Sequence, residues 1–298
     1  MNPLEDLKRT FRQGSSLTRL ILINIVIFLA LKILGVIFFL FHRENLEQLV
    51  LDYLALPADP VLILKRPWTV VRYMFLHYNF MHILFNMLWL YWFGKIFLEY
   101  LNSKKLVSVY LLGGLAGGLV YVLSYNLFPA FTEVVPSAVA LGASAAILAV
   151  VMAISFYVPN YTINLVFIGR VKLKYIALVT VLIDILSIRS GNAGGHIAHL
   201  GGALFGFLYA AQLQRGHDLS KGFNRFMDSL FSLFRRRPGK VRVKYRKSGN
   251  RAETDMEYNA RKAQDQKNID RILDKISKSG YDGLSKEEKE SLFRNSKK

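Results

Sequence analysis

Apolar residues in this chain come in long blocks and do not alternate with polar ones. Blocks of about 18 to 25 residues are long enough to cross the hydrocarbon core of a bilayer as helices. Polar segments separate six such blocks, which predict membrane spans at about 17–41, 80–97, 106–127, 141–157, 173–188 and 196–213. The pattern therefore predicts an all-α membrane protein with six transmembrane helices.

The distribution of Lys and Arg predicts the orientation of these helices, because basic loops are retained on the cytoplasmic side. The segment before the first block is basic, and so is the turn at Lys104 and Lys105, whereas residues 128–139 contain neither Lys nor Arg. The first block is too long for a cleavable signal peptide and is expected to remain in the protein. We expect cytoplasmic termini, with the second, fourth and sixth helices beginning at the outer face.

The segments outside the blocks have different characters. Residues 42–67 carry apolar side chains at helical spacing and predict a short helix lying in the membrane interface. Residues 250–266 are typical of a solvated linker, and Ser285 with Glu288 forms a capping-box motif in a predicted helical hairpin. The expected organisation is a cytoplasmic tail, a six-helix domain, a basic juxtamembrane segment with a linker, and a small helical hairpin, at 1–16, 17–215, 216–266 and 267–298.

Net charge and the lack of cysteine narrow the possible functions. A net charge of +18 would suggest nucleic acid as the partner of a soluble protein. Here the basic residues flank the membrane blocks, so we expect the basic tail to contact anionic lipid and expect no nucleic-acid partner. The chain has no cysteine, which excludes a thiol nucleophile and thiolate metal sites. Any chemistry must use Ser, His, Asn or carboxylates.

Polar groups suited to acyl transfer stand near the start of the three inward-running helices. Ser144, two residues after Gly142, begins the fourth block, His82 and Asn86 begin the second, and His196 begins the sixth. A serine hydroxyl becomes nucleophilic when a neutral imidazole takes its proton. The oxyanion that forms then needs donors, which an amide, a second imidazole and the backbone N–H of the serine can supply. We therefore expect these groups to meet in the outer third of the bilayer.

Two further features concern the packing of the last two blocks. Gly202 and Gly206 are four residues apart and predict a face on which helices approach closely, and we expect Gly142, near the start of the fourth block, to serve helix packing as well. Asp184 lies toward the outer end of the fifth block, where an acid is costly and is usually paired.

These residues resemble the rhomboid family of intramembrane serine proteases. The resemblance covers about 17–215 and is carried, in order and spacing, by Phe75-Leu76-His77-x4-His82-x3-Asn86, Gly142-x-Ser144 and His196-x2-His-Leu-Gly-Gly202-x3-Gly206. It implies a six-helix core and a Ser144–His196 dyad without an acid partner. His82, Asn86 and the backbone of Ser144 would stabilise the oxyanion.

The resemblance also implies substrates and a location. Family members use water, without a metal or cofactor, to cleave transmembrane proteins that enter laterally from the lipid. A bacterial plasma membrane is the implied location. The predicted hairpin is similar to a small domain appended to some bacterial rhomboids.

Two other functions remain open at this point. The family motif often has Gly after the serine and an aromatic residue one turn later, where this chain has Ala145 and Leu148. These differences suggest a rhomboid-like protein that binds transmembrane helices without cleaving them. Alternatively, the histidines at 77, 82, 196 and 199 could form a path for a metal or proton together with Asp184, but Gly142-x-Ser144 would then have no role.

Overall fold

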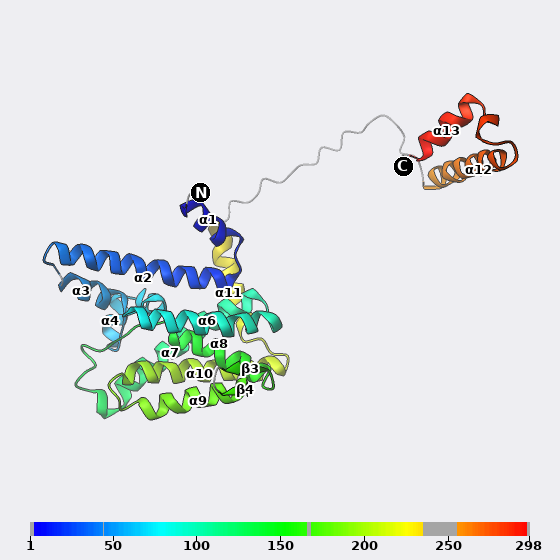
Figure 1. Cartoon of the computed structure of the whole chain (residues 1–298). Coiled ribbons are helices and arrows are strands. Elements are labelled where there is room, and N and C mark those ends of the chain that lie inside the picture. The colour runs from blue at the N-terminus through cyan, green and yellow to red at the C-terminus, as the bar shows by residue number, and fades with distance from the viewer. Residues whose placement is uncertain (1–2, 44, 166–167, 235–254, 297–298) are drawn as a thin grey trace. The chain divides into compact units, whose positions relative to one another are not determined.

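The computed structural model describes residues 3–43, 45–165, 168–234 and 255–296 of the chain. These residues fold as two compact units, Met1–Arg235 and Arg236–Lys298 (Figure 1). Each unit is described by itself below.

The long helices of the first unit coincide with the predicted blocks (Figure 1). They are α2 (Ser16–Leu40), α6 (Phe80–Tyr100), α7 (Ser103–Leu127), α8 (Ser144–Tyr157), α9 (Leu173–Ser187) and α10 (Ala193–Gln214). By length and composition α2, α6 and α7 could each cross a membrane, and α8 is a shorter apolar helix. The predicted all-α fold is confirmed, while membrane crossing by six helices stays a prediction.

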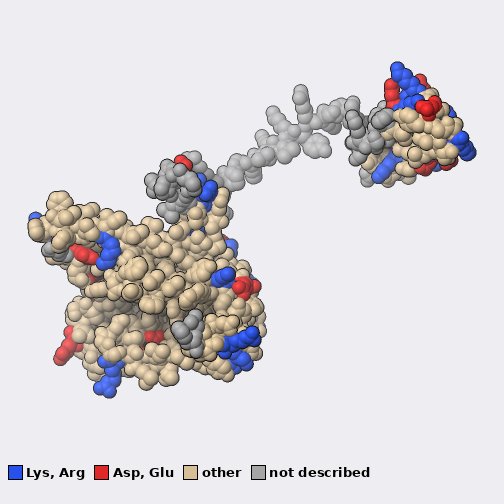
Figure 2. All heavy atoms as spheres, viewed as in Figure 1, with Lys and Arg blue, Asp and Glu red and all other residues tan. Residues whose placement is uncertain are grey.

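The surface of the first unit fits a lipid environment. Figure 2 shows that most of the charged side chains on this face gather toward the ends of the long helices and that the band between them is largely uncharged. Large apolar side chains such as Ile33 on α2 and Leu186 on α9 are exposed. Exposed apolar surface of this kind is stable in lipid, where it need not be removed from water.

Short elements connect the long helices. They are α1 (Pro3–Gln13), α3 (Asn45–Leu54), α4 (Pro60–Lys65), α5 (Thr69–Arg72), the 3-10 turns η1 (Tyr73–Phe75) and η2 (Pro129–Phe131), and α11 (Ser220–Phe234). The predicted short helix within 42–67 corresponds to α3, which ends before Pro57, and Pro60 begins the separate short helix α4. Helix α11 lies in the segment predicted to be a basic flank, and Asp228 pairs with Lys104 of α7.

Two small antiparallel sheets were not predicted. Strand β1 (Leu56–Pro57) pairs with β2 (Val139–Ala140), and β3 (Thr162–Leu165) pairs with β4 (Gly169–Lys172). The register Leu56 to Ala140 links the first loop to the segment that leads into α8. This pairing helps to fix the backbone just before Ser144.

Helix α8 is the centre of the first unit. It packs against α6, α7, α9 and α10, and its side chains from 145 to 155 are buried. A helix that is apolar on every side belongs in a core. Glycines let the neighbouring backbones approach, because a side chain at Gly202 would overlap the carbonyl of Ala145 and one at Gly206 would overlap the carbonyl of Ala149. The predicted packing role of these two glycines is consistent with this geometry.

The second unit is a helical hairpin made of α12 (Asp255–Ser279), the turn η3 (Tyr281–Gly283) and α13 (Lys286–Ser296). Ile272 and Leu284 are buried apolar side chains of this unit. The linker predicted over 250–266 is helical from Asp255 onward, and the basic run from 240 to 247 lies outside the described residues. The hairpin was predicted from residue 267, so the predicted start of its first helix was too late.

The predicted capping box is confirmed and gives the hairpin a pH dependence. The backbone N–H of Ser285 donates to the Glu288 carboxylate (2.8 Å), and the N–H of Glu288 donates to Ser285 Oγ (3.3 Å). The ammonium of Lys275, 2.9 Å from the same carboxylate, is the main cause that lowers the pKa of Glu288 below its usual value.

A group whose pKa is lower in the folded state stabilises that state above its unfolded pKa, and the contribution disappears as pH falls through the folded value. We therefore expect the backbone amides of α13 to lose hydrogen-exchange protection below about pH 4. Glu288→Gln should reduce this pH dependence. Equal protection of parent and variant at pH 7, together with equal loss at pH 3, would contradict the prediction. Exchange measured on the full chain and corrected for intrinsic rates provides the test.

Candidate functional site

Ser144 is the first residue of α8 and is placed there by an unusual turn. Gly142 has φ +136°, a conformation that side-chain-bearing residues rarely adopt, and its N–H donates to the carbonyl of Tyr73 (2.9 Å). Gly142 thus lies in the connection between β2 and α8, outside the helix in which it was expected to serve packing. Backbone N–H groups in the first turn of a helix have no intrahelical acceptor, so the start of α8 offers donors next to Ser144.

A cavity of about 770 Å³ opens at this point. Among the residues that the structure describes, its polar lining includes the predicted Ser144, His82 and Asn86, and also His199. Helices α6, α8 and α10 each contribute to this lining, and Thr180 of α9 does so as well. His196 is not among the described lining residues.

His82 is oriented by its own helix terminus. Asn79 caps α6, accepting from the N–H of His82 (2.9 Å), and the N–H of Tyr78 donates to His82 Nδ1 (3.4 Å). Because Nδ1 accepts, the proton of the neutral ring lies on Nε2. A methyl group built on Gly142 would lie 3.1 Å from His82 Nε2 and 3.4 Å from Ser144 Oγ. The missing side chain of Gly142 therefore leaves a space about one atom wide between an N–H donor and the serine hydroxyl.

Asn86 lies one turn further along α6. Its side-chain Nδ2 donates to the carbonyl of His82 (2.9 Å), which holds the amide against the helix. An Asn amide has two N–H groups, and Asn86 is also part of the cavity lining. It can contribute a donor beside His82. His77 is buried behind this pair, with its ring edge-on to that of His82 at 5.1 Å.

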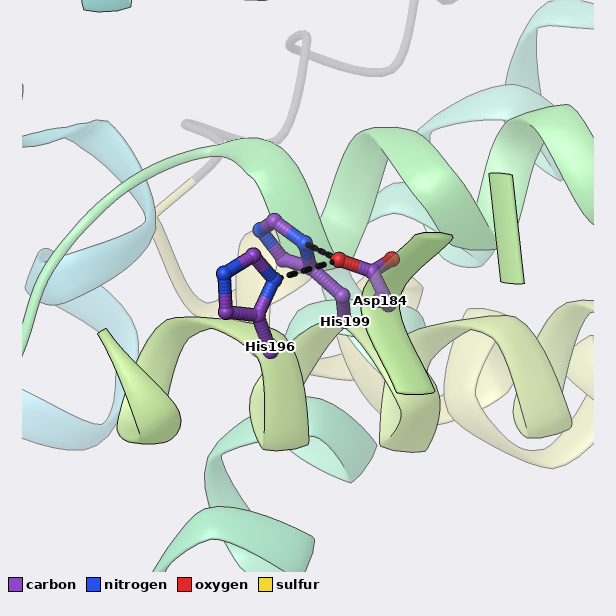
Figure 3. Close-up of side chains that lie close together, drawn as sticks. All are labelled: Asp184, His196 and His199. Atoms are coloured by element: carbon purple, nitrogen blue, oxygen red, sulfur yellow. Dashed lines mark hydrogen bonds and ion pairs between the residues drawn. The ribbon is translucent and has the colours of Figure 1, made fainter. Parts of the chain in front are cut away.

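Asp184, His196 and His199 form a hydrogen-bonded cluster between α9 and α10 (Figure 3). Asp184 Oδ1 lies 2.8 Å from Nδ1 of His196 and 2.8 Å from Nδ1 of His199. An ionised carboxylate only accepts hydrogen bonds, so both Nδ1 atoms carry protons. The resemblance implied a dyad without an acid partner, which stays a prediction; in the structure the Asp184 carboxylate is in contact with both candidate bases.

Among the described residues, Asp184, His196 and His199 have ligand atoms within 4.8 Å of one another, which is close enough to hold a metal ion. Two ligands of a tetrahedral ion, each about 2.1 Å from it, lie about 3.4 Å apart. The two separations of 2.8 Å are shorter than this and match hydrogen bonds. The geometry fits a carboxylate held by two imidazoles better than a coordination site.

Helical spacing explains why His199, and not His196, reaches the cavity. Gly195, His199, Gly202 and Gly206 follow a 4-3-4 spacing and lie along one face of α10. Gly202 and Gly206 of this face meet α8, and Gly195 and His199 line the cavity. His196 lies toward the side of this face. The glycine spacing was visible in the sequence and could have identified His199.

The two residues that depart from the family motif have different surroundings. Ala145 is buried, with its Cβ directed at Gly117 of α7, and it is not among the described lining residues. Leu148 lines the cavity. The extra methyl of Ala145 therefore fills a helix contact and does not narrow the site.

Comparisons with known proteins agree with this architecture. The model of the rhomboid domain family matches residues 64–216, just over half of the chain, and residues 252–298 match a family of unknown function, DUF6576. Curated relatives include the Rhomboid protease GlpG of Salmonella paratyphi A and of Salmonella typhi, each 32% identical over 96 residues, and that of Salmonella newport at 31%. This stretch covers 32% of the chain and 30% of each relative, so the match spans less than a third of the relatives' length. With the domain match extending over most of the helical unit that contains Ser144, the chain belongs to the rhomboid family of integral membrane proteins.

Proposed function

We propose that this protein is an intramembrane serine endopeptidase with Ser144 as its nucleophile. The observation that carries the proposal is the space beside Gly142, which has His82 Nε2 on one side and Ser144 Oγ on the other. The space opens into a cavity that is also lined by an imidazole able to act as a base. The relatives named above are proteases, which supports the same reaction.

We assign the base to His199, where the sequence had suggested His196. His199 Nε2 would take the Ser144 proton as Oγ attacks the carbonyl carbon of the scissile peptide bond. The proton then passes to the leaving amine, which departs as the acyl-enzyme forms. A water molecule, activated by the same imidazole, hydrolyses the acyl-enzyme and restores the serine. No metal or cofactor takes part.

The oxyanion of each tetrahedral intermediate would occupy the space beside Gly142. His82 Nε2–H, the Asn86 amide and the backbone N–H of Ser144 supply donors around it. Such donors act strongly when bulk water is kept away, since their charges are then poorly screened. This assigns the oxyanion role to the same three residues that the sequence predicted.

Substrates and location follow from the same proposal. The substrates are transmembrane proteins that enter laterally from the bilayer and are cut in or near their membrane helices. The termini lie in the cytoplasm of a bacterial cell, and the basic segment after α10 contacts anionic lipid. Nucleic acid is not a partner.

Fluorophosphonate labelling of purified, detergent-solubilised protein tests the nucleophile. The parent should be labelled and Ser144→Ala should not, with cleavage of a reconstituted transmembrane substrate falling in parallel. Ser155→Ala is the matched control, because Ser155 is a buried serine on the same helix, far from the start of α8, and should leave labelling unchanged. Labelling that persists in Ser144→Ala would contradict the proposal. If the folded parent binds the transmembrane helices of other proteins but is neither labelled nor able to cleave them, the binding function is indicated.

A further inference from the structure

We propose that Asp184 is a positioning residue of this site, holding His199 in the tautomer and orientation that present Nε2 to Ser144. The inference rests on the proposed function and adds a third member to its Ser144–His199 pair. It also gives His196 a role as the second donor that fixes the Asp184 carboxylate.

Asp184 lies where burying a carboxylate costs free energy, so its partners matter. The residue is 4% exposed on a largely apolar helix whose neighbouring side chains, Ile183 and Ile185, are more than half exposed. A buried carboxylate is costly unless it is paired and hydrogen-bonded. Among the described residues its partners are the two histidines, both on Oδ1, and Oδ2 has no hydrogen-bond partner. The carboxylate is thus compensated by these two imidazoles.

The bond to Nδ1 determines what His199 can do. A neutral imidazole has one protonated and one unprotonated nitrogen, and only the unprotonated one can accept a proton. With Nδ1–H donating to Asp184, the unprotonated nitrogen is Nε2, on the opposite side of the ring. The carboxylate also stabilises the imidazolium that forms when His199 takes the serine proton. Orientation, tautomer and charge are all set by one 2.8 Å contact.

His196 and His82 complete the surroundings of His199. His196 donates to the same Oδ1 from one turn earlier on α10, and this second bond restricts rotation of the Asp184 side chain. His82 of α6 lines the same cavity as His199. A positive charge on either neighbour would oppose protonation of His199, and Asp184 supplies the compensating negative charge.

The decisive comparison is Asp184→Asn with Asp184→Ala in the full chain, reconstituted with a transmembrane substrate. The Asn side chain can offer its NH2 to Nδ1, which would move the ring proton to Nε2 and block the base. We expect kcat to fall by about 10²- to 10⁴-fold in both variants, at least as far in Asn as in Ala, with KM within about threefold of the parent. A merely structural role predicts the opposite order, since Asn preserves shape. Ile185→Ala, an exposed change on the same helix, is the control and should retain kcat.

Nitrogen-15 chemical shifts of the His199 ring provide a readout that does not require activity. The parent should show a protonated Nδ1, and Asp184→Asn should show the proton on Nε2. An unchanged tautomer, or a kcat within about threefold of the parent in both variants, overturns the inference while Ser144-dependent labelling still supports the proposed function. Loss of parent cleavage on treatment with a metal chelator would also overturn it, by assigning the cluster to a cation. If the parent shows no Ser144-dependent labelling, the proposed function itself is contradicted, which is a different outcome from those that overturn the role of Asp184.

Discussion

Replacing His199 with alanine is expected to lower cleavage by at least about 10³-fold, because the serine hydroxyl then has no base beside it. His196→Ala should stay within about tenfold of the parent. His199 lines the cavity with Ser144, whereas His196 bonds to Asp184 beside it. Removing His196 leaves the Asp184–His199 contact in place. The two histidines differ by one turn of the same helix, so each variant serves as the matched control of the other.

The measurement is the rate of fluorophosphonate labelling together with kcat on a reconstituted substrate, with thermal unfolding of each variant as a check of folding. Labelling is informative because it needs an activated serine but no transmembrane substrate. A reversed order, with His196→Ala inactive and His199→Ala active, would restore the dyad suggested by the sequence. Equal and partial losses in both would indicate that the cluster with Asp184 acts as a unit, and double variants would then be needed to measure the coupling.

The sequence was sufficient for the helices of the core and for the meeting of three of them at one site. Long apolar blocks correspond to helices because backbone groups in lipid must satisfy one another within the segment. The inward direction of alternate helices then placed Ser144, His82 and Asn86 at one depth. All three line the same cavity. Depth along a helix can thus be inferred from its boundaries.

Rotation about the helix axis was harder to infer. His196 and His199 lie at nearly the same depth, and choosing between them requires knowing which face of α10 meets α8. That face is set by Gly202 and Gly206, whose missing side chains allow contact with the α8 backbone. The role of Asp184 depends on how α9 is turned against α10, which no pattern in the α9 sequence indicates. The pairing of β1 with β2 is equally non-local, since it joins segments about 80 residues apart.

The second large effect is expected for Gly202→Ala, which changes no chemical group of the site. A methyl group at Gly202 would overlap the carbonyl oxygen of Ala145 and lie 2.8 Å from its carbonyl carbon. Backbone atoms of a buried helix cannot move aside as a flexible side chain can, so α10 must shift away from α8. A shift of about 1 Å between a nucleophile and its base costs about 10²-fold in rate. We expect labelling of Ser144 to slow by this factor, with the unfolding free energy reduced by about 1–3 kcal/mol.

Gly222→Ala is the matched control for this change. Gly222 lies in α11, and a methyl group there would meet nothing within 4 Å. Replacing an unstrained helical glycine by alanine favours the helix by about 1 kcal/mol, so this variant should label at the parent rate and unfold no earlier. Normal labelling by Gly202→Ala would show that the α8–α10 contact can widen without separating Ser144 from its base. Such a result would favour a base carried by another helix and would place His82 of α6 as the next residue to replace. Slow labelling confined to Gly202→Ala would instead show that the spacing between two helix backbones sets the activity of the serine.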